Sequence, residues 1–146
     1  MKPYKQGYFK PLNPQKYIGT HPIIYRSSLE KKFMEFVDDN PNVIGWGSES
    51  YKIPYIKPTD NKIHIYYIDF FVHIKNKNSQ IEKYIVEVKP HKYTLPPKES
   101  KNKAKRTMLY ESLNWVINSA KWEAAKQFAQ KYNYKFDIIT EKHLSK

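Results

Sequence analysis

Residues 64–74 have the sequence HIYYIDFFVHI, and they are followed by KNKNSQ at 75–80 and IEKYIVEVKP at 81–90. β-Branched and aromatic residues dominate both flanks while Lys, Asn and Ser fill the middle, so this stretch predicts two antiparallel strands joined by a turn. Side chains alternate between the two faces of a strand. The face that we expect to meet the core carries Ile68, Phe70, Val72, Ile74, Tyr84, Val86 and Val88.

Charged residues occupy the opposite face of this predicted hairpin. Asp69 belongs to the first strand, and Ile85, Glu87 and Lys89 share one face of the second. With the turn centred near Asn78, Asp69 lies directly opposite Glu87, with the two Cβ atoms roughly 5 Å apart. Carboxylates this close repel each other, and burial strengthens the repulsion, so the pair needs a cation or a shared proton. All-oxygen ligation suits Mg²⁺, which commonly takes one or two protein carboxylates. The alternative is an exposed Glu87–Lys89 ion pair on an edge strand.

The size and charge of the chain favour a single domain with a polyanionic partner. Its 146 residues fit one compact domain with a real core. The 26 Lys and Arg residues outnumber the 14 Asp and Glu residues, which leaves a net charge of +12 and favours nucleic acid over an anionic membrane. Thirteen Tyr, seven Phe and three Trp residues supply flat rings, mostly for core packing and otherwise for stacking on bases.

The chain contains no cysteine, which excludes a disulfide framework and a thiolate zinc site and permits an intracellular location. Residues 1–7 do not resemble a secretion signal, and no stretch approaches the roughly 20 apolar residues that span a bilayer. We therefore expect a protein that is not secreted by the usual signal and has no membrane partner.

The first 26 residues mix Pro, Gly, Lys and Tyr without periodicity, which predicts an extended basic and aromatic arm ahead of a domain at residues 27–146. The arm either packs on its own domain or follows a phosphate backbone. In the second case the contacts would come from Lys2, Lys5, Lys10 and Lys16.

A helix is predicted from Ser28 to about Asp38, because Ser27 and Glu30 have capping-box spacing and apolar residues follow at helical intervals. Two roles remain open for Glu30. Its carboxylate either satisfies the free N–H groups of the helix or reaches the metal site. Further strands are predicted over 43–49 and 51–55.

Three other polar residues near the hairpin are less favoured as members of the site. Glu49 is a further acidic candidate, although a single Glu beside Ser is usually solvated. His64 and His73 match no zinc signature, and we expect both on the surface.

Beyond Pro90, residues 91–97 predict a loop and residues 98–106 concentrate positive charge. This basic segment either contacts the DNA backbone or is a solvated helix start. The candidate DNA contacts are Lys98, Lys101, Lys103, Lys105, Arg106 and Lys121.

The C-terminal third predicts helices and a last strand. An apolar stripe of Met108, Leu109, Leu113, Val116 and Ile117 indicates one helix. We expect residues 118–119 to separate it from a second helix over 120–132, and a strand over 134–140 to follow. The element order is that of an α/β sandwich.

Asp69 followed across a hairpin by Glu87-Val88-Lys89 resembles the core of the PD-(D/E)xK, restriction-endonuclease-like nucleases, with Ile68 in place of the usual Pro. With the helix start at Glu30 and the segments 121–125 and 136–141, the chain resembles the TnsA-like endonucleases. It is still more similar to the head completion nucleases of T-even-type tailed phages, over roughly residues 20–144. The resemblance implies a mixed central sheet flanked by helices.

The resemblance also implies Mg²⁺-dependent hydrolysis of DNA phosphodiesters, with Mn²⁺ as a substitute ion. Asp69, Glu87 and the backbone carbonyl of Val88 would hold the metal, and Glu30 would complete the site or position a second ion. Lys89 would orient or deprotonate the attacking water, and the neighbouring carboxylates favour orientation because they keep the ammonium group charged.

For the phage branch, the resemblance implies double-stranded DNA as substrate, action late in head assembly before the tail joins, and phage head, portal or neck proteins as partners. The protein would then lie in the host cytoplasm during assembly, or on the virion. Two alternatives stay open: a non-catalytic DNA-binding protein that seals a capsid vertex, and a bacterial restriction or repair nuclease with the same chemistry.

Overall fold

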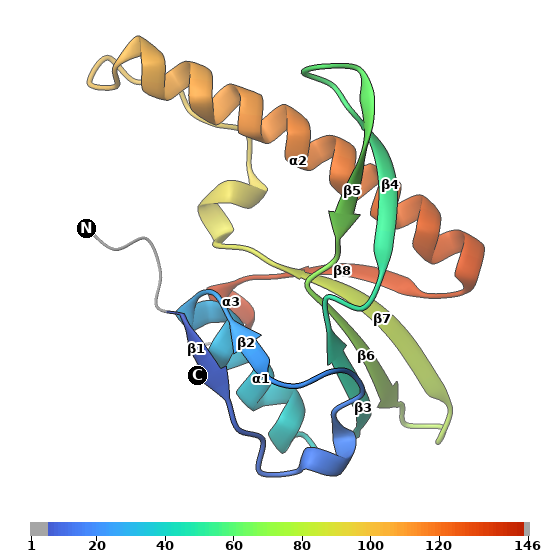
Figure 1. Cartoon of the computed structure of the whole chain (residues 1–146). Coiled ribbons are helices and arrows are strands. Elements are labelled where there is room, and N and C mark those ends of the chain that lie inside the picture. Colours follow the sequence, from blue (N-terminus) through green and yellow to red (C-terminus); the bar gives the residue numbers. More distant parts are fainter. Residues whose placement is uncertain (1–5, 145–146) are drawn as a thin grey trace.

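The computed structural model describes residues 6–144 and centres on a four-stranded sheet with the order β3-β6-β7-β8 (Figure 1). The strands are β3 (Val43–Ser48), β6 (Phe70–Lys75), β7 (Ile81–Val88) and β8 (Lys135–Ile139). β6 pairs antiparallel with both β3 and β7, whereas β7 and β8 are parallel. The predicted mixed sheet is therefore confirmed.

Two helices cover the two faces of this sheet (Figure 1). Helix α1 (Ser28–Asp39) packs Phe33, Met34 and Val37 against even-numbered residues of β6 and β7, such as Phe70 and Val86. Helix α2 (Lys105–Tyr132) covers the other face with buried residues from its second half. Because both faces are buried, the sheet carries apolar side chains on each side along most of its length. The α/β architecture follows the sequence-based expectation.

Shorter elements surround this core. Strands β4 (Lys52–Lys57) and β5 (Lys62–Tyr67) form a separate hairpin that packs on α2. Strands β1 (Gly7–Phe9) and β2 (Ile23–Tyr25) form a second small sheet. The remaining elements are the 3-10 turns η1 (Pro14–Lys16) and η2 (His91–Thr94) and the short helix α3 (Glu141–Leu144).

The described part of the N-terminal arm, residues 6–26, packs on the domain and contains two strands that the sequence did not predict. Phe9 and Ile23 are buried in the α1 core. Lys16 donates hydrogen bonds to the backbone carbonyls of Asp38 and Asn40. It therefore caps the C-terminal end of α1. Of the other proposed phosphate contacts, Lys2 and Lys5 lie outside the described residues, and the boundary at residue 26 stays a prediction.

The first strand of the predicted hairpin is interrupted, which corrects the sequence-based assignment. Residues 64–67 belong to β5 and pair with β4, while β6 begins at Phe70. Between them, Ile68 N donates to Tyr51 O (3.3 Å) and Asp69 O accepts from Glu49 N (3.0 Å). The chain changes direction at these bonds. Ile68 is therefore buried in the core on the α2 side of the sheet, whereas Phe70, expected on the same face, is buried on the α1 side.

Helix α2 is continuous, so the predicted break at residues 118–119 is wrong. Ile117 and Ala120 on either side of this pair pack against the core, and tertiary packing overrides the modest helix propensity of Asn and Ser. The predicted apolar stripe is also only partly buried. Leu109, Leu113 and Val116 are exposed, because the first half of α2 extends beyond the sheet (Figure 1). Within residues 6–144, no helix is both long and apolar enough to cross a lipid bilayer.

Candidate active site

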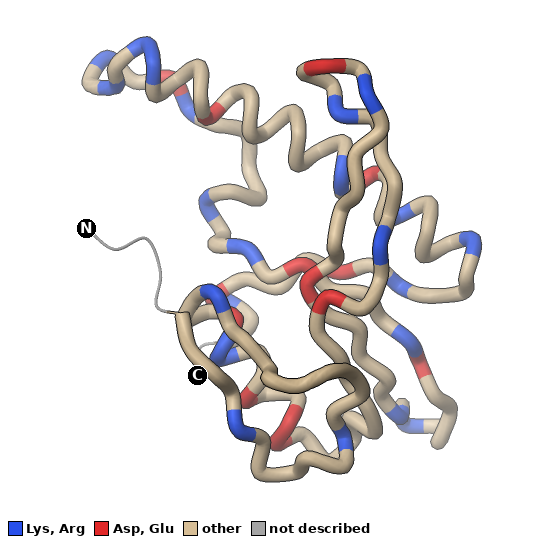
Figure 2. The backbone as a smooth tube through the Cα atoms, in the orientation of Figure 1, with Lys and Arg blue, Asp and Glu red and all other residues tan. Residues whose placement is uncertain are grey.

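Asp69 and Glu87 face each other at one end of the sheet. Phe70 is the partner of Val86 in the β6–β7 register, and one further step along both chains sets Asp69 opposite Glu87. The predicted pairing is therefore confirmed. Figure 2 shows acidic residues gathered in this region, where the sheet meets the β4–β5 hairpin.

Hydrogen bonds orient both carboxylates. The Tyr66 hydroxyl donates to Glu87 Oε1, and the backbone N–H of Val88 donates to Asp69 Oδ2 (2.9 Å). Glu87 is only 6% exposed, so its charge has little contact with water. A buried carboxylate with fixed donors keeps one orientation, which suits a residue that must hold a ligand.

Burial and mutual repulsion disfavour the ionised form of Asp69. Burial first, and then the charge of Glu87, raise the pKa of Asp69 well above its ordinary range, although the Val88 N–H acts in the opposite direction. Burial and the same glutamate also raise the pKa of Tyr66, which keeps this hydroxyl a hydrogen-bond donor. The site therefore favours an additional positive charge.

Lys89 provides one positive charge at the position that the sequence predicted. Its Nζ lies 3.1 Å from Glu87 Oε2, and its side chain is 24% exposed. The alternative, an exposed Glu87–Lys89 ion pair on an edge strand, is wrong. Glu87 is buried, and β7 is paired with a strand on each side.

A second lysine reaches the acid pair from α2. Lys121 lies with its Nζ 5.6 Å from the centre of the Tyr66 ring and 5.9 Å from that of Tyr55. Burial lowers the pKa of Lys121, while the nearby charge of Glu87 raises it. The sequence identified Lys121 as a DNA contact, and the structure brings it beside the candidate catalytic residues.

The Glu30 carboxylate does not satisfy the free N–H groups of α1, and its role at the metal site stays a prediction. The backbone N–H of Glu30 donates to Ser27 Oγ (3.0 Å), which caps α1, and its Oε1 accepts from the backbone N–H of Arg26 (2.8 Å). Burial is the first cause of the raised pKa of Glu30, and the charges of Glu49 and Glu87 raise it further. Ser27, not the Glu30 carboxylate, therefore caps α1, while that carboxylate accepts from the residue ahead of the cap and lies in the electrostatic field of the acid pair.

Glu49 is a fourth acid at this end of the sheet, and its side chain is exposed, as its sequence context indicated. It adopts a positive φ of 51° directly after β3, and its backbone N–H donates to Asp69 O (3.0 Å). Its carboxylate forms an ion pair with Arg26. The position of Glu49 after a strand that ends at the same sheet edge is the feature that could have identified it.

The other sequence-predicted residues are more dispersed. Lys98 and Lys103 line a cavity that reaches Lys89, and Lys103 Nζ bonds to Glu111 Oε1 (2.8 Å). The remaining members of the basic segment are exposed: Lys101 in the loop before α2, and Lys105 and Arg106 in its first turn.

The two histidines lie away from the acid pair. His64 Nε2 forms a hydrogen bond with Asp60 Oδ2 (2.8 Å). The surface prediction is wrong for His73, which is half-buried against the Phe71 and Tyr134 rings.

The donor set fits a divalent cation that keeps part of its water shell. Across residues 6–144, no three His, Asp or Glu side chains converge closely enough to hold a metal by themselves. The two carboxylates nevertheless offer hard oxygen ligands, and the raised pKa of Asp69 means that a nearby cation would favour its ionised form. This matches the preference of Mg²⁺ for one or two carboxylates plus water and phosphate oxygens. Asp69, Glu87 and the Val88 carbonyl are the residues that would hold it.

Comparison with known proteins identifies related chains. Residues 40–141 match the family model described as the TnsA-like endonuclease N-terminal domain. The chain is also 38% identical over 139 residues to the head completion nuclease of enterobacteria phage T4, an alignment that covers 92% of this chain and 90% of the phage protein. The family match includes the β6–β7 hairpin and all of α2, whereas Glu30 precedes it.

Proposed function

The chain belongs to the TnsA-like endonuclease family, and from this premise we propose that it is a Mg²⁺-dependent deoxyribonuclease that hydrolyses phosphodiester bonds in double-stranded DNA. The observation that carries the proposal is the half-buried Asp69 opposite the buried Glu87, with the Lys89 ammonium group 3.1 Å from Glu87. Family membership supports a nuclease, and the two facing carboxylates with the raised pKa of Asp69 support a divalent cation.

The residues of the chain have distinct tasks in this proposal. Mg²⁺, when bound, supplies Lewis-acid stabilisation of the negative charge that develops on the scissile phosphate. Asp69 and Glu87 hold the cation, and their hydrogen bonds from Val88 N–H and Tyr66 keep the carboxylate oxygens oriented. A preoriented pair loses little entropy when substrate arrives.

The two lysines act on the water and on the phosphate. Lys89, beside Glu87, orients the attacking water, while its ammonium group offsets the charge of the transition state. Lys121 lies on the α2 side of the same acids, so its ammonium group attracts the phosphate that approaches them. Neither lysine needs to lose a proton for these tasks.

The relative's name suggests the biological setting. That protein is the head completion nuclease of a tailed phage, and the alignment extends over nine tenths of each chain. We therefore place the proposed DNA cleavage in phage head completion, before the tail joins, with head, portal or neck proteins as partners and the host cytoplasm as the location.

Cleavage of supercoiled plasmid DNA tests the proposal. The wild type is expected to nick and linearise the plasmid with Mg²⁺ and to leave it intact with EDTA, whereas Asp69→Ala and Lys89→Ala are expected to lose at least a hundredfold in rate, a size typical for loss of a transition-state charge stabiliser. Lys77→Ala, in the exposed turn after β6, is the matched control and should cleave like the wild type.

Two results would count against the assignment. Nicking that persists unchanged in Asp69→Ala and Lys89→Ala would remove these residues from the site. DNA binding by the wild type without any Mg²⁺-dependent cleavage would favour the DNA-binding protein that seals a capsid vertex.

A further inference from the structure

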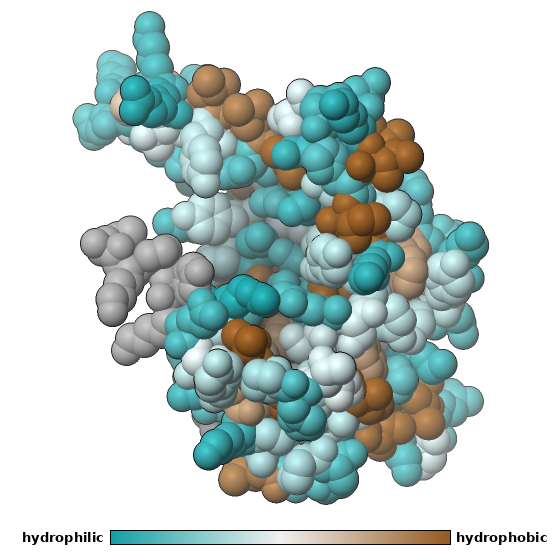
Figure 3. All heavy atoms as spheres, viewed as in Figure 1, coloured by the Kyte–Doolittle hydropathy of each residue, from teal (hydrophilic) through white to brown (hydrophobic). Residues whose placement is uncertain are grey.

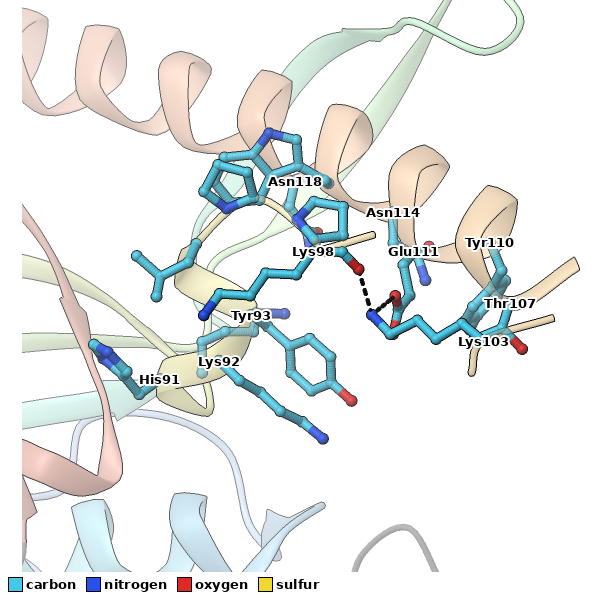
Figure 4. A pocket seen from close by; sticks show the side chains of 15 residues that line it. His91, Lys92, Tyr93, Lys98, Lys103, Thr107, Tyr110, Glu111, Asn114 and Asn118 are labelled. Atoms are coloured by element: carbon cyan, nitrogen blue, oxygen red, sulfur yellow. Dashed lines mark hydrogen bonds and ion pairs between the residues drawn. The ribbon is translucent and has the colours of Figure 1, made fainter. Parts of the chain in front are cut away.

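A large cavity adjoins the candidate active site. Its volume is about 890 Å³, and it lies between the η2 segment and the first half of α2 (Figure 4). The molecular surface is hollowed in this region, with hydrophilic residues inside (Figure 3). Lys89 belongs both to the lining of the cavity and to the ion pair with Glu87. A molecule in the cavity would therefore extend directly from the reaction site.

Two exposed aromatic rings line this cavity. Tyr93 comes from η2 and is 45% exposed, and Tyr110 comes from α2 and is 66% exposed. Figure 4 shows the Tyr93 ring lying in the space between the η2 segment and α2. Lys92 Nζ lies 4.9 Å from the centre of this ring. A nucleobase can stack on such a ring, while the neighbouring ammonium group forms an ion pair with a phosphate of the same strand.

The charge of the lining favours an anion. Four lysines contribute to it: Lys89, Lys92, Lys98 and Lys103. The acidic residue in the lining, Glu111, is already paired with Lys103 at 2.8 Å. Lys89 is likewise paired with Glu87, so Lys92 and Lys98 supply the positive field along the cavity, which suits a phosphodiester backbone.

We propose that this cavity binds an unpaired stretch of a DNA strand next to the scissile phosphate. Bases inside a duplex have their faces covered by neighbouring bases, so exposed tyrosines in a lysine-lined cavity match bases that are free to stack. The protein would then prefer DNA that has a single-stranded segment, such as an overhanging or frayed end. The preference for a cleavage substrate rests on the proposed nuclease function, whereas binding of the unpaired strand does not.

Fluorescence anisotropy with a labelled single-stranded oligonucleotide in EDTA tests the binding step without catalysis. Compared with the wild type, the double variant Tyr93→Leu/Tyr110→Leu is expected to bind about fivefold or more weakly, because each lost stacking contact is worth at least that factor. Both rings are exposed, and leucine keeps the apolar bulk, so the fold should be unaffected. Tyr132→Leu, at the other end of α2 and 53% exposed, is the matched control and should bind like the wild type.

Cleavage of two matched substrates tests the preference for DNA that has a single-stranded segment. One is a blunt duplex, and the other is the same duplex with a single-stranded extension. The wild type is expected to cleave the extended substrate about fivefold or more faster at limiting concentration, and the double variant should lose this ratio while it still cleaves the blunt duplex.

The results separate the two proposals. Equal single-strand binding by the wild type and the double variant, or no binding by the wild type, would overturn the inference about the cavity. Absence of Mg²⁺-dependent cleavage of either substrate, with selective loss of binding in the double variant, would overturn the nuclease function and leave the single-strand site supported.

Discussion

Replacing Asp69 with asparagine is expected to stabilise the protein in the absence of a divalent cation and to abolish cleavage. The substitution removes one of two facing carboxylates and keeps a carbonyl oxygen that can accept from Val88 N–H. The raised pKa of Asp69 gives the sign of the change in stability. The folded protein disfavours the ionised carboxylate, so at neutral pH this group lowers the free energy of unfolding.

The expected size follows from the cross-strand geometry. Two unit charges about 5 Å apart repel by ~3 kcal/mol at an effective dielectric constant of about 20. The Val88 N–H and the lysines offset part of this repulsion, so we expect a net gain of ~1–2 kcal/mol in the free energy of unfolding. For a chain of this length, this corresponds to a rise of about 2–8 °C in Tm.

The gain should depend on pH and on Mg²⁺. An unfolded aspartate titrates near pH ~3.9, and the folded pKa of Asp69 is higher. The wild type therefore loses stability relative to the variant as pH rises above about 4, and the two converge below it. Mg²⁺ should raise the Tm of the wild type, because it binds the folded state, and should have little effect on Asp69→Asn.

Thermal unfolding followed by circular dichroism measures this difference. Wild type and Asp69→Asn are compared in EDTA and in Mg²⁺ at several pH values, with Asp137→Asn as the control, since that residue is exposed on β8 and should change stability by less than ~0.5 kcal/mol. A Tm of Asp69→Asn at or below that of the wild type in EDTA at neutral pH would refute the argument from carboxylate repulsion.

Three further substitutions test other contacts. Tyr66→Phe removes the hydrogen bond to Glu87 and should cost ~1.5–3 kcal/mol in the free energy of unfolding, measured with urea; an unchanged midpoint would contradict this role. Gly47→Ala places a Cβ 2.1 Å from a ring atom of Phe71 and should lower stability by ~1–3 kcal/mol in a thermal melt. Asp38→Ala leaves two backbone N–H groups of the N-terminal segment without their acceptor and should cost ~2 kcal/mol or more, with faster limited proteolysis of that segment than in the wild type.

The errors in the sequence-based description share a cause. Alternation predicts which side chains share a face of a strand, but it cannot show that the strand turns at Ile68 to pair elsewhere. Helix propensity at Asn118 and Ser119 differs from that of better helix formers by only a few tenths of a kcal/mol, and packing of the residues beside them outweighs it. The apolar stripe of α2 is exposed because the helix extends beyond the end of the sheet. The position of that end cannot be read from the sequence of the helix.

The amino-acid sequence by itself determined the β6–β7 hairpin, the register that sets Asp69 opposite Glu87, and the position of Lys89 two residues further on. These are local relations, because turn length and two-residue alternation define neighbours across a hairpin. Only the tertiary structure decided that Lys121 approaches both acids and that the backbone of Glu49 bonds to that of Asp69. Their approach depends on how α2 and β3 dock on the sheet, and that docking is set by long-range burial of apolar surface rather than by spacing along the chain.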